Sequence, residues 1–211
     1  DGYTSSSILV NYIKRRFPNN EIIWRLHKGK EHGIIVDTVP EDCNLVFIPD
    51  AGSNQFEEQK ALAKMGKTVI ILDHHEVTEK EQLLDTPAII VNNQLSPNYM
   101  NKSLSGAGVV YKFIKEMDRE FYPNDHIYHD YGDLAAIGII ADAMNMTTLD
   151  NNYIAYWGLS HIHSKFIHEL ALKQSRGVKN PDPLTKIDVA FYIAPVINGV
   201  IRSGSQADKE M

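Results

Sequence analysis

Two polar sequences follow apolar runs directly, and they hold the residues of this chain most able to do chemistry. Asp50 comes just after the apolar run 45–48, and Asp73-His74-His75 follows the run 68–72. Buried runs of this kind would hold the side chains after them on rigid supports. Carboxylates and imidazoles that converge in this way suit Mn²⁺, Mg²⁺ or Zn²⁺. One strand-end Asp alone would be read as a turn residue, but two such ends in succession favour a metal site.

Asp142 is the third candidate, because it is a carboxylate on the apolar face of a predicted helix. The segment 133–146 is apolar almost throughout, and its inward stripe passes through Leu134 and Ile137 to position 142. A carboxylate buried without a partner costs several kcal/mol, so we expect Asp142 to face a metal, an arginine or several donors. Asp133 stands at the start of the same helix, where N-capping explains it.

Alternating strands and helices must position these residues. Short buried runs predict strands, and apolar residues at helical spacing predict helices. The predicted strands cover residues 21–26, 45–48, 68–72 and 88–91; the predicted helices cover about 4–17, 55–65, 105–121, 133–146 and 151–173, with a linker at 177–183 and an apolar stretch at 187–201. This order predicts an α/β fold with a mostly parallel sheet and flanking helices. In such sheets ligands bind beyond the carboxyl ends of the strands.

Length and composition are those of a globular protein. The chain has 211 residues, of which 43% are hydrophobic and 23% charged. The single cysteine, Cys43, excludes an internal disulfide and a cysteine metal cage, and it favours a reducing compartment, which we take to be the cytoplasm. No apolar stretch approaches the ~20 residues of a bilayer helix, and no secretory leader opens the chain, so we expect no membrane association.

The net charge of −6 at first disfavours a nucleic-acid partner. However, several of the acids are the candidate metal ligands, and bound cations would offset their charge. The acidity therefore marks the site and says little about the partner.

Four short motifs together resemble the DHH phosphoesterase family. They are Asp1-Gly2-x-Thr4-Ser5, which is similar to the end of the family's D-x-D-x-D-G-x-T-S motif; Asp50; Asp73-His74-His75; and Asp142 in G-I-I-A-D. Two further stretches resemble the branch of the RecJ single-strand exonucleases. They are the L-S-G-A-G-V sequence at 104–109 and the A-P-V-I-N-G-V-I-R sequence at 194–202, in which Val196 and Val200 replace the Arg and Gly of the relatives.

The resemblance implies a division of the chain. Residues 1–150 would form the DHH catalytic α/β core, with its first motif truncated because the chain begins at Asp1. Residues 151–211 would form a helical segment and connector towards a missing C-terminal domain. We therefore expect a catalytic core cut at both ends.

The resemblance also implies a role for each matched residue. One metal ion would be held by Asp1, Asp50, His74 and Asp142, and Asp50 would bridge to a second ion whose other ligands precede Asp1. His75 would approach the scissile phosphate, and Asp73 would orient the histidine pair. Arg202 matches the arginine that holds a substrate phosphate. The free backbone N–H groups at the helix start by Thr4-Ser5-Ser6 could also bind phosphate, although ordinary N-capping explains these residues equally well.

The chemistry implied is phosphodiester hydrolysis with two divalent cations, Mn²⁺ or Mg²⁺. Two such ions activate a water and neutralise the phosphoryl oxygens. The resemblance implies a metal-dependent exonuclease that degrades single-stranded DNA, from the 5′ end by family analogy, in repair, recombination or replication. RNA or short oligonucleotides remain possible substrates, and any recruiting protein is unknown. Two alternatives stay open: a DHH phosphoesterase of small substrates (oligoribonucleotides, cyclic dinucleotides, pyrophosphate), and a non-catalytic DHH scaffold.

Overall fold

A parallel sheet supports the carboxyl-end residues of the site. The computed structural model describes residues 1–27 and 31–205. Within them the sheet has three strands in the order β1 (Leu45–Pro49), β2 (Thr68–Asp73) and β3 (Ile89–Asn92). All pairs are parallel: Leu45 lies opposite Thr68, and Asp73 lies opposite Asn92. Three of the four predicted strands and the α/β fold class are confirmed.

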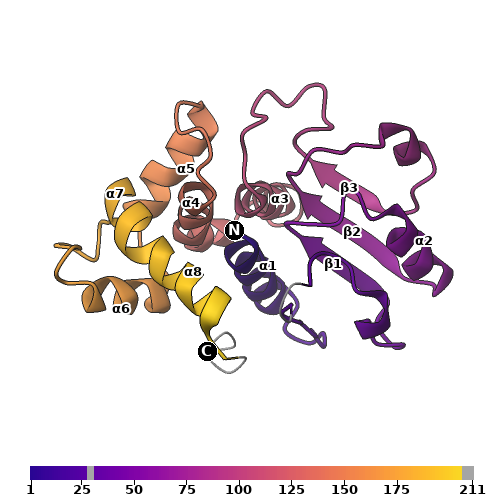
Figure 1. Ribbon diagram of the computed structural model, residues 1–211, viewed down its shortest axis with the longest axis horizontal. Helices are drawn as coiled ribbons and strands as arrows, with labels where there is room; N and C mark the ends of the chain where they lie inside the picture. Colours follow the sequence, from indigo (N-terminus) through magenta and orange to yellow (C-terminus); the bar gives the residue numbers. More distant parts are fainter. Residues whose placement is uncertain (28–30, 206–211) are drawn as a thin grey trace.

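Helices cover both faces of this sheet (Figure 1). Ile70 and Leu72 of β2 face a core shared with α1 (Gly2–Arg16) and α3 (Gly106–Phe121). Val69 and Ile71, which alternate with them, face Leu62 of α2 (Phe56–Lys64) on the opposite side. The period of two along a buried strand therefore builds a three-layer sandwich.

After α3 the chain is helical: α4 (Gly132–Ala141) packs against α1 and α3 on the side away from the sheet, and the later helices pack on α4 and on one another (Figure 1). The later helices are α5 (Leu149–Leu159), α6 (Lys165–Lys173), α7 (Lys186–Asp188), the π-helical η4 (Val189–Ile193) and α8 (Ala194–Ser203). Short 3₁₀ turns lie at η1 (Val36–Thr38), η2 (Lys80–Leu84) and η3 (Ile127–Tyr131). α4 belongs to both halves, because Ala135 and Ile139 join the core with α1 and α3 while Ala136 and Ile137 join the core of the later helices.

The strand predicted at 21–26 is absent. Residues 21–27 have no regular secondary structure, and Ile23 and Trp24 are exposed. A strand needs a hydrogen-bonded neighbour, and no described strand pairs with this segment. The apolar residues of this segment have the pattern of a strand, but the segment has no described partner strand to bond with.

The predicted helix 151–173 is two helices separated by residues 160–164. Ser164 is the N-cap of α6, and its side chain accepts a hydrogen bond from the Ile167 amide. The carboxylate of Asp133 accepts hydrogen bonds from the His163 and Ser164 amides, at 2.9 and 2.7 Å. Asp133 was expected to be the N-cap of its own helix, but the N-cap of α4 is Tyr131. Asp133 Oδ1 accepts from the Leu134 amide of α4, and Oδ2 ties α4 to the start of α6.

Two helix ends also lie at other residues than the sequence predicts. α1 begins at Gly2, two residues before Thr4, and its N-cap is Asp1. The Thr4 and Ser5 hydroxyls donate back to the carbonyls of Asp1 and Gly2, and the Ser5 amide donates to the Asp1 carbonyl, so this serine does not offer a free N–H. The helix predicted at 133–146 ends at Ala141. Among the described residues no helix is long and apolar enough to cross a membrane.

Candidate metal centre

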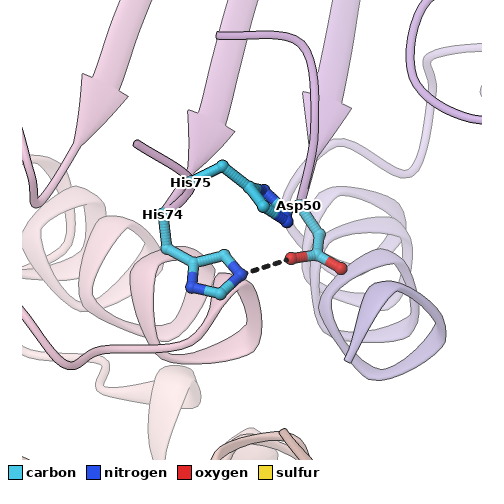
Figure 2. A group of neighbouring side chains, drawn as sticks. All are labelled: Asp50, His74 and His75. Carbon is cyan, nitrogen blue, oxygen red and sulfur yellow. Dashed lines mark ion pairs between the residues drawn. The ribbon is translucent and has the colours of Figure 1, made fainter. Parts of the chain in front are cut away.

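The side chain of His74 lies at the centre of three carboxylates. Its Nε2 is 3.2 Å from Asp50 Oδ1, 3.6 Å from Asp1 Oδ2 and 3.7 Å from Asp142 Oδ2. Figure 2 shows His74 pointing at Asp50, with His75 beside both, just beyond the strand ends. The four residues come from the start of α1, the end of β1, the end of β2 and the end of α4, and the fold brings them together.

Asp1 is fixed by the first turn of α3. Its Oδ2 accepts a hydrogen bond from the Gly106 amide at 2.6 Å, and its Oδ1 accepts one from the Ala107 amide at 2.9 Å. The amides at a helix N-terminus stabilise a carboxylate. α4 lies close on the other side, because a Cβ at Gly138 would be 3.0 Å from Asp1 Oδ1 and 2.4 Å from the Ala107 Cβ.

Asp50 has a left-handed backbone, with φ of 62°. This conformation is uncommon outside glycine, although Asp tolerates it better than most residues, and such strain is frequently found at functional sites. The Asp50 amide donates to the Leu72 carbonyl at 2.8 Å, which ties the turn to β2. The Asp50 carboxylate lies over Gly106, where a Cβ would be only 2.2 Å from Oδ1. The first residue of α3 must therefore be glycine for Asp50 to lie there.

Asp142 reaches the site from the C-cap of α4. The next residue, Ala143, has a φ of 54°, so the chain turns away immediately. Burial, with the neighbouring Asp50 carboxylate, raises the pKa of Asp142. The negative end of the helix dipole is also an unfavourable place for an anion and a favourable place for a cation. Asp142 is 32% exposed, so the expected inward position is reached at a helix end instead of within a buried helix.

Asp73 and His75 form a hydrogen-bonded pair behind the site. Asp73 Oδ1 contacts His75 Nδ1 at 2.7 Å and accepts from the His74 amide at 2.7 Å, while Oδ2 accepts from the Ser53 amide at 3.0 Å. Burial alone would raise the pKa of Asp73, but the hydrogen bonds from His75 and Ser53 outweigh it and hold this pKa well below its usual range. The bond to Asp73 raises the pKa of His75 above its usual value. The pair therefore fixes the orientation of the His75 ring.

The donor set fits a divalent cation. Asp50 Oδ1 and Asp142 Oδ2 are buried oxygens without a hydrogen-bond donor among the described residues. Buried oxygens normally have a partner, and an unfilled acceptor calls for an ion or water. Two groups of three residues share His74: Asp1, His74 and Asp142 form one, and Asp50, His74 and His75 form the other. Within each group the possible ligand atoms all lie within 4.8 Å of one another. Carboxylate oxygens with one or two imidazoles are ligands of Mn²⁺ and Mg²⁺.

Arg202 is not among the residues that the described structure gathers around His74. It lies exposed in the last turn of α8 and makes no hydrogen bond or ion pair with the described residues. Its predicted role as a phosphate contact stays a prediction.

Several supporting residues escaped the motif-based prediction. Gly106 and Ala107 were recognised as a helix start, yet their contacts with Asp1 and Asp50 appear only in three dimensions. Asn92 at the end of β3 donates to Ser53 Oγ at 3.0 Å and to the His75 carbonyl at 2.9 Å. Its position at the third strand end was the available signal.

Sequence comparison decides the family. The sequence profile of the DHH family, N-terminal domain, matches residues 1–139, which contain Asp1, Asp50 and the Asp73-His74-His75 motif. The chain belongs to the DHH family. The match covers the sheet, both of its helical layers and most of α4, whose C-cap is Asp142.

The relatives of this DHH chain include exonucleases. It is 45% identical over 210 residues to the SPbeta prophage-derived protein YorK of Bacillus subtilis (strain 168), whose assigned name is that of a single-strand DNA-specific exonuclease. It is 30% identical over 226 residues to the single-stranded-DNA-specific exonuclease RecJ of the same organism. These alignments cover 100% and 99% of this chain but 35% and 26% of the relatives. The DHH chain thus spans about a third or less of their length.

Solved structures agree with the fold. A crystal structure of exonuclease RecJ bound to manganese matches with a TM-score of 0.76 and 27% identity, over 96% of this chain and 51% of that one. The RecJ of Thermus thermophilus, in complex with Mn²⁺, matches with a TM-score of 0.74 over 98% of this DHH chain and 31% of that one. At 24% identity the second match bears on the fold alone.

Proposed function

We propose that this chain is the catalytic part of a RecJ-like exonuclease that hydrolyses phosphodiester bonds in single-stranded DNA. The observation that carries the proposal is the convergence of three carboxylates on His74 Nε2, with two buried carboxylate oxygens left without a donor among the described residues. Burial of several like charges is unfavourable unless cations offset them. The YorK and RecJ relatives support single-stranded DNA as the substrate, the RecJ structure bound to manganese supports Mn²⁺, and family analogy supports cleavage from the 5′ end.

Each residue of the site has a proposed role. Asp1, Asp50, His74 and Asp142 would hold a divalent cation, and Asp50 would bridge to a second one. Bound cations of this type lower the pKa of water and offset charge on phosphoryl oxygens. His75, oriented by Asp73, would contact the scissile phosphate, which suits a ring that is 47% exposed and directed by a 2.7 Å bond. Arg202 would hold a substrate phosphate.

The proposal extends to the division of the chain. Residues 1–150 would be the catalytic core, and 151–211 the connector towards a further domain; of the connector, residues 206–211 lie outside the described part. The family match over residues 1–139 supports the first boundary. The two parts share α4, since its Ile137 packs in one core with Leu159 and Ile193. We therefore propose one continuous unit. A DNA substrate and a single unpaired cysteine support a cytoplasmic location.

A cleavage assay with two substrates tests the function. A long 5′-phosphorylated single strand and a dinucleotide are compared with Mn²⁺, with Mg²⁺ and with EDTA. We expect metal-dependent release of mononucleotides from the long strand at a higher kcat/KM than cleavage of the dinucleotide. Faster cleavage of the dinucleotide would favour a small-substrate phosphoesterase. Failure to bind Mn²⁺ in a calorimetric titration, with no cleavage of either substrate, would favour a non-catalytic scaffold.

A further inference from the structure

An additional ring, His32, lies beside the candidate site without belonging to the metal-ligand groups. Its centroid is 6.1 Å from that of His75, and the two rings are nearly perpendicular at 82°. On its other side the His27 ring is 6.2 Å away and tilted by 51°. Neither neighbour stacks on His32, and His32 is exposed. A face of this ring is therefore open to a planar ligand at the rim of the site.

The chain just after His32 is firmly anchored. Ile34 is buried against Leu62 and Ile71 in the core beneath β1 and β2. Its amide donates to Gln55 Oε1 at 2.7 Å. Gly33 has a φ of +72°, and a Cβ there would lie 1.8 Å from the same oxygen. These contacts fix the backbone next to His32. The His32 ring therefore lies beside His75 on a turn that is held by the core.

The surroundings of His32 distinguish among three roles. As a metal ligand it would join the clusters of convergent donor atoms, and the cluster of Asp50, His74 and His75 among the described residues does not include it. As a structural residue it would be buried or hydrogen-bonded, and it is exposed. An exposed aromatic ring beside a phosphate-contacting histidine suits stacking, because the base of a nucleotide lies one sugar away from its phosphate.

We propose that His32 forms a base-stacking subsite for a nucleotide that flanks the scissile phosphate. The inference rests on the proposed function, since it needs a nucleic-acid substrate at His75. Base stacking depends little on base identity, because each base has a π-face. The subsite would thus secure the strand at the cleavage point without selecting a sequence.

Abasic substrates test this proposal. Two short 5′-phosphorylated single strands carry a tetrahydrofuran residue at the first or the second nucleotide, which flank the first phosphodiester; a third strand is intact. Cleavage with Mn²⁺ is measured for the wild type, His32→Ala, His32→Gln and His32→Phe. The control His168→Ala removes a partly exposed histidine of α6. Mn²⁺ affinity is measured calorimetrically for every variant.

We expect His32→Ala and His32→Gln to lose roughly tenfold or more in kcat/KM on the intact strand. On the abasic strand that lacks the stacked base, these variants should match the wild type. His32→Phe should stay close to the wild type on all strands, and Mn²⁺ affinity should not change. As a second readout, 2-aminopurine at the same position should be quenched on binding to the wild type and less so on binding to His32→Ala.

Three results overturn the subsite. Equal losses for His32→Ala on the intact strand and on both abasic strands would exclude stacking. Activity kept by His32→Gln but lost in His32→Phe would indicate a hydrogen bond instead. A loss of Mn²⁺ affinity would make His32 part of the metal centre. If the wild type neither binds nor cleaves any strand, the proposed function itself is wrong, and this is a different result from a wild type that cleaves strands without a contribution from His32.

Discussion

Asp142 combines two unfavourable positions, a helix C-terminus and the neighbourhood of other carboxylates. The dipole of α4 and the Asp50 carboxylate both oppose its charge, and its Oδ2 has no described donor. A side chain in this position contributes little to stability on its own. The divalent cation proposed for this site would offset both effects.

Replacement of Asp142 by alanine should abolish metal-dependent hydrolysis while the fold survives. We expect at least a 100-fold loss of activity, because metal-centre ligands and their supports are worth one or two orders of magnitude each. Circular dichroism and the thermal midpoint should match the wild type or improve on it. Asp85→Ala, at an exposed acid away from the site, is the matched control. Hydrolysis by Asp142→Ala with Mn²⁺ at the wild-type rate would contradict the site assignment.

Gly106→Ala should weaken Mn²⁺ binding by about 10- to 100-fold, since supporting residues of metal sites have effects of this size. The new Cβ would lie 2.2 Å from Asp50 Oδ1, so the carboxylate must move. Isothermal titration calorimetry measures the affinity. Gly199→Ala in α8 is the control, because its Cβ meets nothing within 4 Å and alanine favours a helix. An unchanged affinity in Gly106→Ala would show that Asp50 is not held by this glycine.

At this scale the sequence predicts the residues that carry charge and misses the ones that support them. Asp50, His74 and Asp142 were predicted from strand ends and an apolar stripe, and the fold brings them together. The supports are backbone amides and the missing Cβ of Gly106. No side-chain type in a sequence indicates that such groups belong to a site. Their partners are more than 50 residues away, so local pattern could not pair them.

Among the elements, α1 and α3 are joined at both ends. One end has the Asp1 carboxylate on the α3 amides, and the other has Asp118 of α3 beside Arg16 of α1. Asp118 is fully buried and accepts hydrogen bonds from the Tyr12 hydroxyl, the Arg16 guanidinium and the Tyr128 amide. This ion pair holds α1, the helix whose N-cap is Asp1.

Asp118→Ala should destabilise the protein by about 3–5 kcal/mol, because it leaves the Arg16 charge without its buried partner. Chemical denaturation measures the change in the free energy of unfolding. Asp130→Ala is the matched control: it removes the partner of Arg15 at an exposed pair, where about 1 kcal/mol or less is expected. An equal loss of unfolding free energy in the two variants would contradict the larger stabilising role assigned to Asp118.

The elements themselves were mostly predictable, and the exceptions have physical causes. The strands at 45–48, 68–72 and 88–91 formed because each of these apolar runs has a parallel neighbour to pair with. The segment 21–26 has a similar pattern but no described neighbour to pair with. The break between α5 and α6 depends on Asp133, a side chain some 30 residues earlier that binds the amides of His163 and Ser164.

For the whole molecule, divalent cations should raise the thermal midpoint. A ligand that binds only the folded state stabilises it by about 2.7 kcal/mol at a concentration of 100 Kd. Differential scanning fluorimetry with Mn²⁺, with Mg²⁺ and with EDTA measures the shift. Asp142→Ala should show a much smaller shift at the same concentrations. A midpoint that does not respond to either metal in the wild type would argue against a metal centre.

The positions of the site residues along the chain have a consequence for the order in which the protein is made. Asp1 is held by amides that come 105 and 106 residues later, and Asp142 comes later still. During synthesis from the N-terminus, Asp1 leaves the ribosome long before its partners exist. The complete cluster of acids and His74 can form only after α4 has emerged and packed against α1 and α3, so it forms after the sheet and its two helical layers have been synthesised.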